Sequence, residues 1–266
     1  MKIAVIGAGN MAYAIIKSVK DSERMATDIF YAYDKSEEQL KKISLLGSRC
    51  CNSLAEAVID SDFVLLSVKP QDLDNVILSI KNDADFSKLK FVSICAGIST
   101  DYICRVFGED VPVIRVMPNA PLTVGAGATA ITRNNYINDK DFSKICGLFS
   151  FGGEVAVIPE SQMNAVISVN SSSPAYFFEF IRIMVKYAVS QGIDEKIARS
   201  MAQNAMYGAS KMLLQNDKTP EELINIVASK KGTTEAALQK LESNDFEKTI
   251  FEAMDACTAR AFELGK

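Results

Sequence analysis

The chain has 266 residues, of which 48% are hydrophobic and 23% charged, and its formal net charge is −4. This balance predicts a globular protein of one large or two smaller domains and argues against a disordered chain. The negative charge and the lack of a basic stripe argue against nucleic acid as a partner. The absence of histidine excludes hydrolases that rely on a histidine base.

The N-terminus is a poor secretion signal, because glycines and Asn10 interrupt its short apolar run. No stretch approaches about 18 consecutive apolar residues. We therefore expect a cytoplasmic protein with no membrane partner. The cysteines, at positions 50, 51, 95, 104, 146 and 257, lack CxxC spacing, so we expect reduced thiols and no metal site.

The first half of the chain alternates between short β-branched runs and segments with apolar residues at helical spacing. Strands are predicted at 2–6, 28–34, 62–68, 90–96 and 111–117, with helices in the segments 7–19, 36–47, 71–80 and 99–108. Such alternation is typical of a parallel sheet with helices on both faces, which is a doubly wound α/β fold.

After residue 118 the pattern changes towards helix. The last strands are predicted at 125–132 and 152–159, and helices at 162–191 with an interruption at 171–174, at 194–214, at 220–228, from 232 and at 244–264. We therefore predict an α/β domain at 1–159 and an all-helical domain at 160–266. The long apolar helices of the second domain exceed what one small core can bury, which is typical of a dimerisation module.

The string GAGNMA at 7–12 stands where the first strand becomes the first helix and fits the pattern G-x-G-x-x-G/A. Gly7 permits the tight turn, Gly9 allows a pyrophosphate to approach the backbone, and Ala12 keeps helix and sheet close. The phosphates would lie at the helix N-terminus. A glycine turn also joins strands to helices for structural reasons alone, but its place in a βαβ unit favours a dinucleotide site.

Two charged residues at the end of the second strand bear on the choice of dinucleotide. Asp34 could accept from the ribose hydroxyls of NAD and repel the 2′-phosphate of NADP, whereas Lys35 argues for NADP. Alternatively, Asp34 caps the helix that begins near Ser36.

The later strands supply further candidates at their carboxyl ends, where open parallel sheets bind ligands. These are SVKP at 67–70, CAG at 95–97 and MPNAP at 117–121. Lys69 is either a wall of the cleft or a solvated surface charge. Asn119, between two prolines, could orient a ring amide or a water, or could serve a structural turn.

A second cluster, SKKGTTEAAL at 229–238, combines hydroxyl groups and lysines at a predicted helix start. Free N–H groups from Thr233 onwards and the helix dipole would form a pocket for a small anion, and a carboxylate is the expected ligand. Capping of the helix by a threonine is an equal alternative on spacing alone.

Seven strings follow one another in register between residues 7 and 242: GAGNMAYAI, VKPQ, VSICAGI, VIRVMPNAP, VGAGATAI, SPAY and GTTEAALQKLE. Together they resemble the pyrroline-5-carboxylate reductase family, which catalyses the last step of proline synthesis. The resemblance implies an N-terminal Rossmann domain that binds NADPH or NADH, followed by a helical dimerisation domain. It also implies a homo-oligomer, at least a dimer, with a ring of dimers as the larger alternative.

The resemblance assigns site residues by position. The pyrophosphate would contact Gly7, Gly9, Asn10, Met11 and Ala12, and the adenosine ribose or its 2′-phosphate would contact Asp34, Lys35 and Asn52. Val68, Lys69, Pro70, Ala96 and Gly97 would line the cofactor cleft, with Asn119 near the nicotinamide. The family's substrate loop, SPGGTT, is matched at Ser229, Gly232, Thr233 and Thr234.

The implied reaction transfers hydride from NAD(P)H to the imine carbon of 1-pyrroline-5-carboxylate and gives L-proline. Backbone amides of the loop would bind the substrate carboxylate. Thr234, with Ser229 as the second catalytic candidate, would lie beside the imine nitrogen. A protonated imine is already an electrophile, so positioning of the two rings would account for most of the catalysis without histidine.

The substrate half of the chain departs from the family's pattern. SPGGTT becomes SKKGTT with Lys230 and Lys231, GSGPAY becomes SSSPAY with Ser171 and Ser173, and the usual aspartate before the AV pair is Asn164. Glycine-to-serine changes matter where a positive φ or a close approach is needed.

These departures leave two alternatives, a reductase of another cyclic imine and a dinucleotide-sensing relative without turnover. A β-hydroxyacid dehydrogenase would need a catalytic lysine that the segment SSSPAYFFEF does not contain. Cofactor preference and feedback inhibition by proline stay open.

Overall fold

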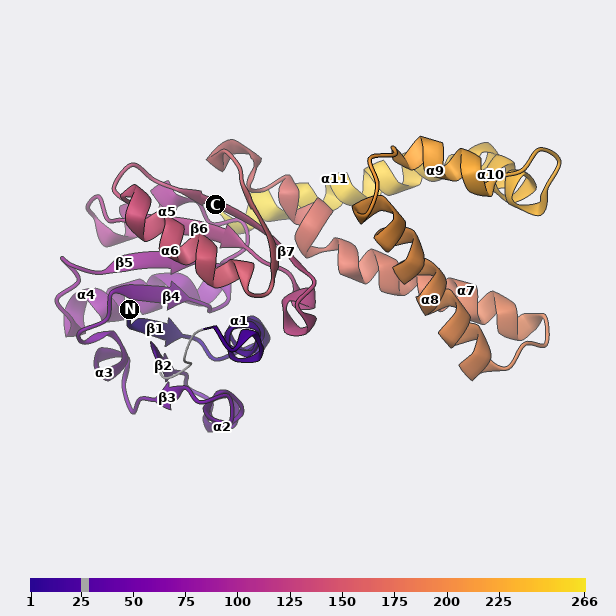
Figure 1. Cartoon of the computed structure of the whole chain (residues 1–266). Coiled ribbons are helices and arrows are strands. Elements are labelled where there is room, and N and C mark those ends of the chain that lie inside the picture. The colour runs from indigo at the N-terminus through magenta and orange to yellow at the C-terminus, as the bar shows by residue number, and fades with distance from the viewer. Residues whose placement is uncertain (25–28) are drawn as a thin grey trace. The chain divides into compact units, whose positions relative to one another are not determined.

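The computed structural model describes residues 1–24 and 29–266, so Asp28, where the second strand is predicted to start, lies outside the described residues. Packing divides the chain into two compact units (Figure 1). The sheet unit comprises Met1–Pro174 and Ala256–Lys266, and the helical unit comprises Ala175–Asp255. The domain boundary expected near residue 160 stays a prediction, because this division follows packing alone.

The sheet unit is built on one sheet with the strand order β3-β2-β1-β4-β5-β6-β7-β8. Its strands are β1 (Ile3–Ile6), β2 (Phe30–Tyr33), β3 (Arg49–Cys50), β4 (Phe63–Leu66), β5 (Lys90–Ser93), β6 (Val113–Met117), β7 (Gly127–Arg133) and β8 (Gly153–Val157). Neighbouring strands are parallel except for β6 and β7, which are antiparallel. The strand order reverses between β1 and β4, and ligands of open α/β sheets bind outside the carboxyl ends of strands at such a point.

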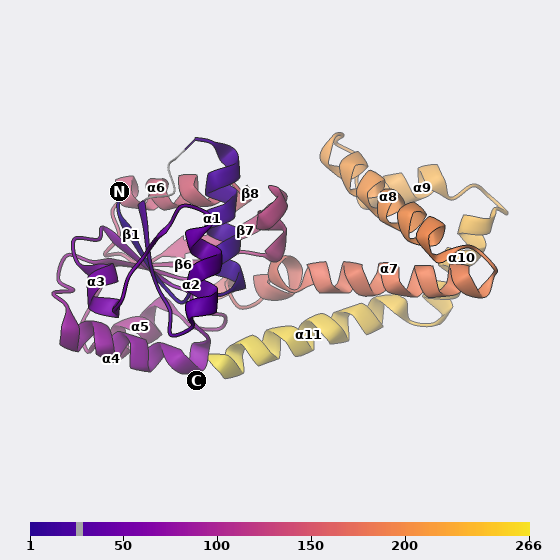
Figure 2. The ribbon, with the colours of Figure 1, turned by 90° about the horizontal axis from the view of Figure 1, so that it is seen from below.

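Helices cover both faces of this sheet, as predicted (Figure 2). They are α1 (Asn10–Ser22), α2 (Glu37–Ser44), α3 (Leu54–Val58), α4 (Leu73–Asp83), α5 (Thr100–Phe107) and α6 (Asp139–Ser150). Apolar residues of α1, α2 and α6 form one core with the sheet, and those of α3, α4 and α5 form a second core on the opposite face. The alternation of inward-facing side chains along each strand therefore serves two cores.

Most of these helices begin at a polar side chain that accepts from the first turn. Ser36, Ser53, Ser99 and Asn138 cap α2, α3, α5 and α6 in this way. Helix α4 continues from a 3-10 turn without such a cap. In helix α1 the N-cap is Gly9, and no side chain accepts from its first N–H groups. Those groups are left for another acceptor.

The remaining helices are α7 (Ser173–Ser190), α8 (Glu195–Leu214), α9 (Pro220–Val227), α10 (Thr233–Ser243) and α11 (Phe246–Leu264). Helices α8, α9 and α10 lie wholly in the helical unit, whereas α7 and α11 each run from one unit into the other. Thr219 starts α9 with a reciprocal capping box to Glu222. Along the described residues, every helix is too short or too polar to cross a bilayer.

The predicted α/β and all-helical organisation is confirmed, with differences in detail. The helix expected from residue 162 begins only at Ser173, because the chain first forms a 3-10 turn at Glu160–Gln162 and a π-helical turn at Ile167–Ser171. Helices α3 and α6 were not predicted. The strand at 127–133 returns antiparallel to β6, which departs from the uniform parallel sheet that was expected.

A buried carboxylate fixes α6 to the sheet. Asp141 accepts from Lys144 Nζ at 2.7 Å and from Lys90 Nζ at 3.0 Å, and Asn138 Nδ2 adds a hydrogen bond at 3.0 Å. The hydrogen bond from Lys144 is the main reason why the pKa of Asp141 lies well below its usual range. A carboxyl whose pKa is lowered by folding stabilises the protein above its unfolded pKa, and this stability is lost as the pH falls.

We predict that Asp141→Asn lowers the free energy of unfolding by about 1–3 kcal/mol at pH 7, because charge-assisted hydrogen bonds are lost. The difference from the wild type should shrink below about pH 4, the unfolded pKa of aspartate, because the carboxylate of the unfolded wild-type chain takes up a proton there while the folded one stays charged. Urea unfolding at pH 7 and pH 3 measures both values. An equal difference at the two pH values would contradict this role of the charge.

Candidate active site

A cavity of about 550 Å³ opens at the carboxyl ends of β1 and β4, where the strand order reverses. Its wall includes these predicted cofactor residues: Gly7, Gly9, Asp34, Lys35, Val68 and Lys69. Ser67, in the predicted segment SVKP, also lines it, as do residues that the sequence did not single out: Tyr33, Ser53, Leu54, Asn75 and Val76. Tyr33 directly precedes the predicted Asp34, and Ser53 caps α3, so position next to a strand end or a helix start could have identified them.

The glycine loop has the geometry of a phosphate cradle. Gly7 has φ +96°, and a Cβ there would stand 2.4 Å from the carbonyl oxygen of Ser67, so only glycine fits the turn. At Gly9, a Cβ would meet no atom within 4 Å. That open space lies beside the uncapped N-terminus of α1, where backbone N–H groups and the helix dipole favour an anion.

The next predicted residues lie on the first turn of α1. Asn10 is exposed, Met11 packs partly against the core, and Ala12 is fully buried. The small side chain of Ala12 therefore allows α1 to approach the sheet, as the pattern predicts.

Asp34 has two bonds to the backbone. Its Oδ2 accepts from the N–H of Ala8 at 2.6 Å, and its Oδ1 accepts from the N–H of Ser36 at 2.8 Å. The cap of α2 is Ser36 itself, so the alternative in which Asp34 serves only as the helix cap is wrong. The carboxylate ties the glycine loop to the end of β2 while lining the cavity beside Lys35.

Two other predicted residues lie next to the cavity without lining it. The N–H of Asn52 donates to Glu56 at 2.7 Å, and the following residue, Ser53, lines the cavity. Pro70 begins a 3-10 turn directly after Lys69, and this turn leads the chain from the cavity wall into α4.

The segment Cys95–Ser99 follows β5, and we call it the cofactor turn because it carries Ala96 and Gly97. Gly97 has φ +81°, and a Cβ there would stand 2.2 Å from the carbonyl oxygen of Ala261 in α11. Cys95 Sγ lies 3.4 Å from the carbonyl oxygen of Val68. Burial raises the pKa of the Cys95 thiol to about 11, so the thiol is protonated near neutral pH.

Asn119 is buried, and both ends of its amide are bonded within the protein. Its Nδ2 donates to the carbonyl of Asn170 at 3.0 Å, and its Oδ1 accepts from the N–H of Ala128 at 2.9 Å. Asn170 in turn donates to the carbonyls of Met117 and Ala128 at 2.7 and 3.0 Å. These bonds support the structural alternative for Asn119. The sequence carried no signal for Asn170, whose partners lie far away along the chain.

The serines that replace the family's glycines are compatible with the backbone. Among the described residues, the positive φ values of non-glycine residues belong to Glu23, Asp60, Lys231 and Asp245. Ser171 and Ser173 therefore adopt conformations open to any residue. Between them, Ser172 Oγ lies 3.2 Å from Cys257 Sγ in α11.

In the helical unit, the predicted substrate loop is a tight turn before α10. The N–H of Gly232 donates to the carbonyl of Ser229 at 2.9 Å, and a Cβ at Gly232 would stand 2.5 Å from Ser229 Oγ. Gly232 is the N-cap of α10, and no side chain accepts from the first N–H groups. Capping by a threonine is therefore wrong for this helix, and its amide end is available to an anion.

Lys231 occupies a left-handed conformation in this loop, with φ +58°. It stands where the family string SPGGTT has glycine, the residue that adopts this conformation without strain. Its N–H donates to Glu235 Oε2 at 2.6 Å, which stabilises the turn from the first turn of α10.

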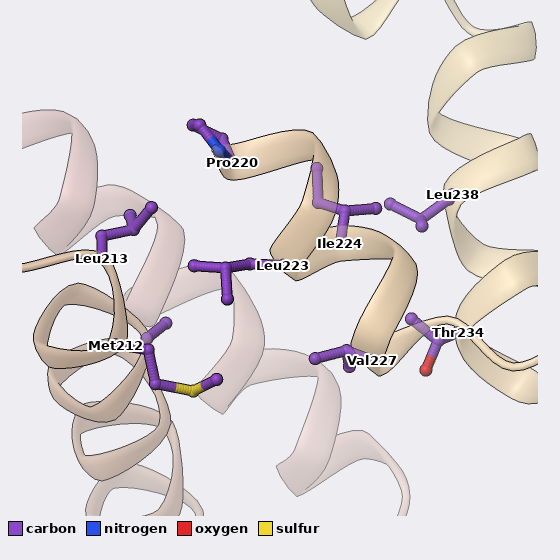
Figure 3. A pocket seen from close by; sticks show the side chains of 9 residues that line it. Met212, Leu213, Pro220, Leu223, Ile224, Val227, Thr234 and Leu238 are labelled. Carbon is purple, nitrogen blue, oxygen red and sulfur yellow. The ribbon is translucent and has the colours of Figure 1, made fainter. Parts of the chain in front are cut away.

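Thr233 is exposed, whereas Thr234 is half-buried at the edge of an apolar cavity of about 320 Å³. Leu223, Ile224, Val227 and Leu238 line this cavity (Figure 3). The hydroxyl of Thr234 lies on the side away from Ile224 and Leu238 (Figure 3).

The predicted cofactor residues belong to the sheet unit and the predicted substrate loop to the helical unit. Among the described residues, no group of three acidic or cysteine side chains is arranged to hold a metal ion.

Two family models match the chain. Residues 160–264 match pyrroline-5-carboxylate reductase dimerisation, and residues 2–97 match NADP oxidoreductase, coenzyme F420-dependent. A pyrroline-5-carboxylate reductase of Haemophilus influenzae is 37% identical over 265 residues, covering 98% of this chain and 97% of the relative. That of Escherichia coli K12 is 33% identical over 266 residues, covering 100% and 98%.

Solved structures agree with these relatives. The 1-pyrroline-5-carboxylate reductase of Streptococcus pyogenes superposes with a TM-score of 0.89 at 29% identity, covering 99% of this chain and 98% of that one. Plasmodium falciparum pyrroline carboxylate reductase with NADP bound has a TM-score of 0.91 at 23% identity, covering 100% and 98%, which supports the fold. With end-to-end identity above 30% and a matching architecture in both units, the chain belongs to the pyrroline-5-carboxylate reductase family.

Proposed function

We propose that the protein is a pyrroline-5-carboxylate reductase, which reduces 1-pyrroline-5-carboxylate to L-proline with NADPH or NADH. The observation that carries this function is the open glycine loop at the point where the strand order reverses, in a chain that matches such reductases over its whole length. The residues present fit a dinucleotide, because Gly9 leaves free space beside the uncapped end of α1.

Each group of residues has a defined part in this reaction. The glycine loop and the first amides of α1 bind the pyrophosphate, and Asp34 and Lys35 face the adenosine ribose. The uncapped amides at Thr233 and Thr234 bind the substrate carboxylate. The Thr234 hydroxyl, with Ser229 beside the turn, holds the imine nitrogen by a hydrogen bond, directly or through water.

When bound, the reduced nicotinamide supplies the hydride that adds to the imine carbon. The nitrogen carries the proton before the step and keeps it as the secondary amine of proline. The protein therefore needs no strong general acid, and the bound substrate needs mainly to be held at the correct distance and angle. This agrees with a chain that lacks histidine.

The two oxygens of Asp34 already accept from Ala8 and Ser36, so they have less capacity for ribose hydroxyls. Lys35 lines the same cavity with a positive charge. On this basis we propose NADPH as the preferred cofactor. A cytoplasmic location remains a prediction.

Steady-state oxidation of NADPH and, separately, NADH by the purified protein tests this function, with and without racemic 1-pyrroline-5-carboxylate. We expect substrate-dependent turnover and a higher kcat/KM with NADPH. Consumption of either cofactor only with another cyclic imine would favour the altered-substrate alternative. Binding of both cofactors without turnover would favour the sensing alternative.

The helical unit supports an oligomeric enzyme, because it exposes large apolar side chains, among them Phe177, Phe178, Tyr187, Met201 and Tyr207. Apolar surface of this kind marks protein contacts. We propose a homodimer as the smallest form, and light scattering should give at least twice the 29.0 kDa of the chain. A mass of 29.0 kDa at micromolar concentration would contradict it.

The left-handed conformation of Lys231 allows a test of whether the backbone of the predicted substrate loop is strained. Lys231→Gly should raise the free energy of unfolding by about 1 kcal/mol, because the strain of a side chain at positive φ is removed. For a chain of this size that is a rise in Tm of about 2–4 °C. Lys230→Gly is the matched control, since it removes the same charge from a residue outside the positive-φ set. An equal rise in both variants would contradict the backbone explanation.

A further inference from the structure

Arg115 is a buried cation in the middle of the sheet. It is the third residue of β6, and only 2% of its surface is exposed. The other residues of this strand are apolar: Val113, Ile114, Val116 and Met117. A buried guanidinium costs free energy unless it is paired and hydrogen-bonded. The hydrogen-bond partners of Arg115 therefore indicate its role in the structure.

Its partners come from the segment after β8. Arg115 Nη1 donates to Glu160 Oε1 at 2.9 Å, and Nη2 donates to Asn164 Oδ1 at 2.5 Å. Arg115 Nε and Glu160 Oε2 are buried without a partner among the described residues. The contact between the two charges therefore depends on the single oxygen Oε1 of Glu160.

The same oxygen also holds the end of the cofactor turn. Glu160 Oε1 accepts from the N–H of Thr100 at 3.2 Å, and Thr100 is the first residue of α5. A carboxylate at a helix N-terminus is favourable, and the guanidinium keeps this one in place. Since Ser99 is the N-cap of α5, the bond lies directly after the cofactor turn.

The other parts of the cofactor turn have different supports. At its start, the N–H of Cys95 donates to Ser93 Oγ at 3.3 Å. In its middle, Gly97 packs against Ala261. At the α5 end, Ser99 Oγ accepts from the N–H of Tyr102 at 3.1 Å, and the link from Glu160 adds a bond from 60 positions along the chain. Removal of that link would loosen this end of the turn.

We propose that Arg115 and Glu160 are positioning residues for the cofactor, and that they act through the Thr100 N–H on the turn that carries Ala96 and Gly97. This inference rests on the proposed function, in which that turn lies against the bound dinucleotide. Neither side chain has to touch the cofactor. Their effect is on how tightly it binds.

Two substitutions at Glu160 separate the hydrogen bond from the charge. Glu160→Gln keeps an oxygen that can accept from Thr100 and Arg115 but leaves the buried guanidinium without a counter-charge, so it should lower stability. Glu160→Ala removes the acceptor as well. Fluorescence titration of the full-length protein with NADPH should give a Kd raised about tenfold for Glu160→Ala and changed less than about threefold for Glu160→Gln.

Steady-state kinetics should show the same difference between Glu160→Ala and Glu160→Gln in their affinity for NADPH. In Glu160→Ala, KM for NADPH should rise about tenfold while kcat at saturating cofactor stays within about threefold of the wild type. Asp141→Asn is the control for general destabilisation, because it breaks a buried ion-pair cluster on α6 and should leave the Kd for NADPH unchanged. Arg115→Met, which leaves Glu160 unpaired, should weaken NADPH binding in the same direction as Glu160→Ala.

The inference is overturned if Glu160→Ala binds NADPH like the wild type, or if Glu160→Gln is as weak as Glu160→Ala. It is also overturned if Asp141→Asn weakens binding to the same extent, since affinity would then follow stability. Wild-type protein that binds neither NADPH nor NADH overturns the proposed function together with this inference. Wild-type binding without reduction of 1-pyrroline-5-carboxylate overturns the substrate alone, and the Kd comparison still decides the role of Glu160.

Discussion

The approach of Gly7 to the carbonyl of Ser67 is the constraint on which the cofactor site depends. A Cβ at Gly7 would stand 2.4 Å from that oxygen, so the contact exists only because the side chain is absent. It joins the loop after β1 to the residue after β4, on either side of the point where the strand order reverses. The cavity adjoins this contact, since Gly7, Ser67 and Asp34 all line it, and Asp34 accepts from the N–H of Ala8, the residue after Gly7.

The same device recurs in the helical unit with different residues. Gly232 lies against Ser229 Oγ and leaves the first amides of α10 without a side-chain cap. In both places the N-cap residue is glycine, which has no side chain to accept from the first N–H groups, so these groups are left for an anion. Two helix starts with a glycine N-cap, those of α1 and α10, thus leave their first amides without a side-chain acceptor, one suited to a pyrophosphate and one to a carboxylate. The other helices with a capping side chain, such as α2 and α9, have no comparable vacancy.

Local sequence signals were sufficient for much of this architecture. Short β-branched runs located the strands of the sheet other than the two-residue β3, and GAGNMA located the phosphate cradle, because both depend on neighbours along the chain. Helix α6 was missed although Phe142, Ile145, Leu148 and Phe149 have helical spacing after the cap Asn138. The antiparallel return of β7 was also readable, since segment 118–126 is too short for the crossover that a parallel strand needs.

Other parts of the site depend on contacts between distant residues, which periodicity does not encode. Asn119 was given a role towards the cofactor, yet its amide is bonded to Asn170 and Ala128. The bond from Thr100 to Glu160 joins residues 60 positions apart. For Ser171 and Ser173, the question was whether the backbone needs glycine, and only the φ values could answer it.

The environment of Cys95 has a consequence for the chemical resistance of the enzyme. A thiol reacts with oxidants and alkylating agents through its thiolate, and a pKa of about 11 leaves very little thiolate at Cys95 near neutral pH. Its sulfur is also enclosed by the carbonyls of Leu66 and Val68. Cys95, at the start of the cofactor turn, is therefore poorly reactive towards electrophiles, and a thiol reagent is expected to modify a more accessible position such as Cys50 first.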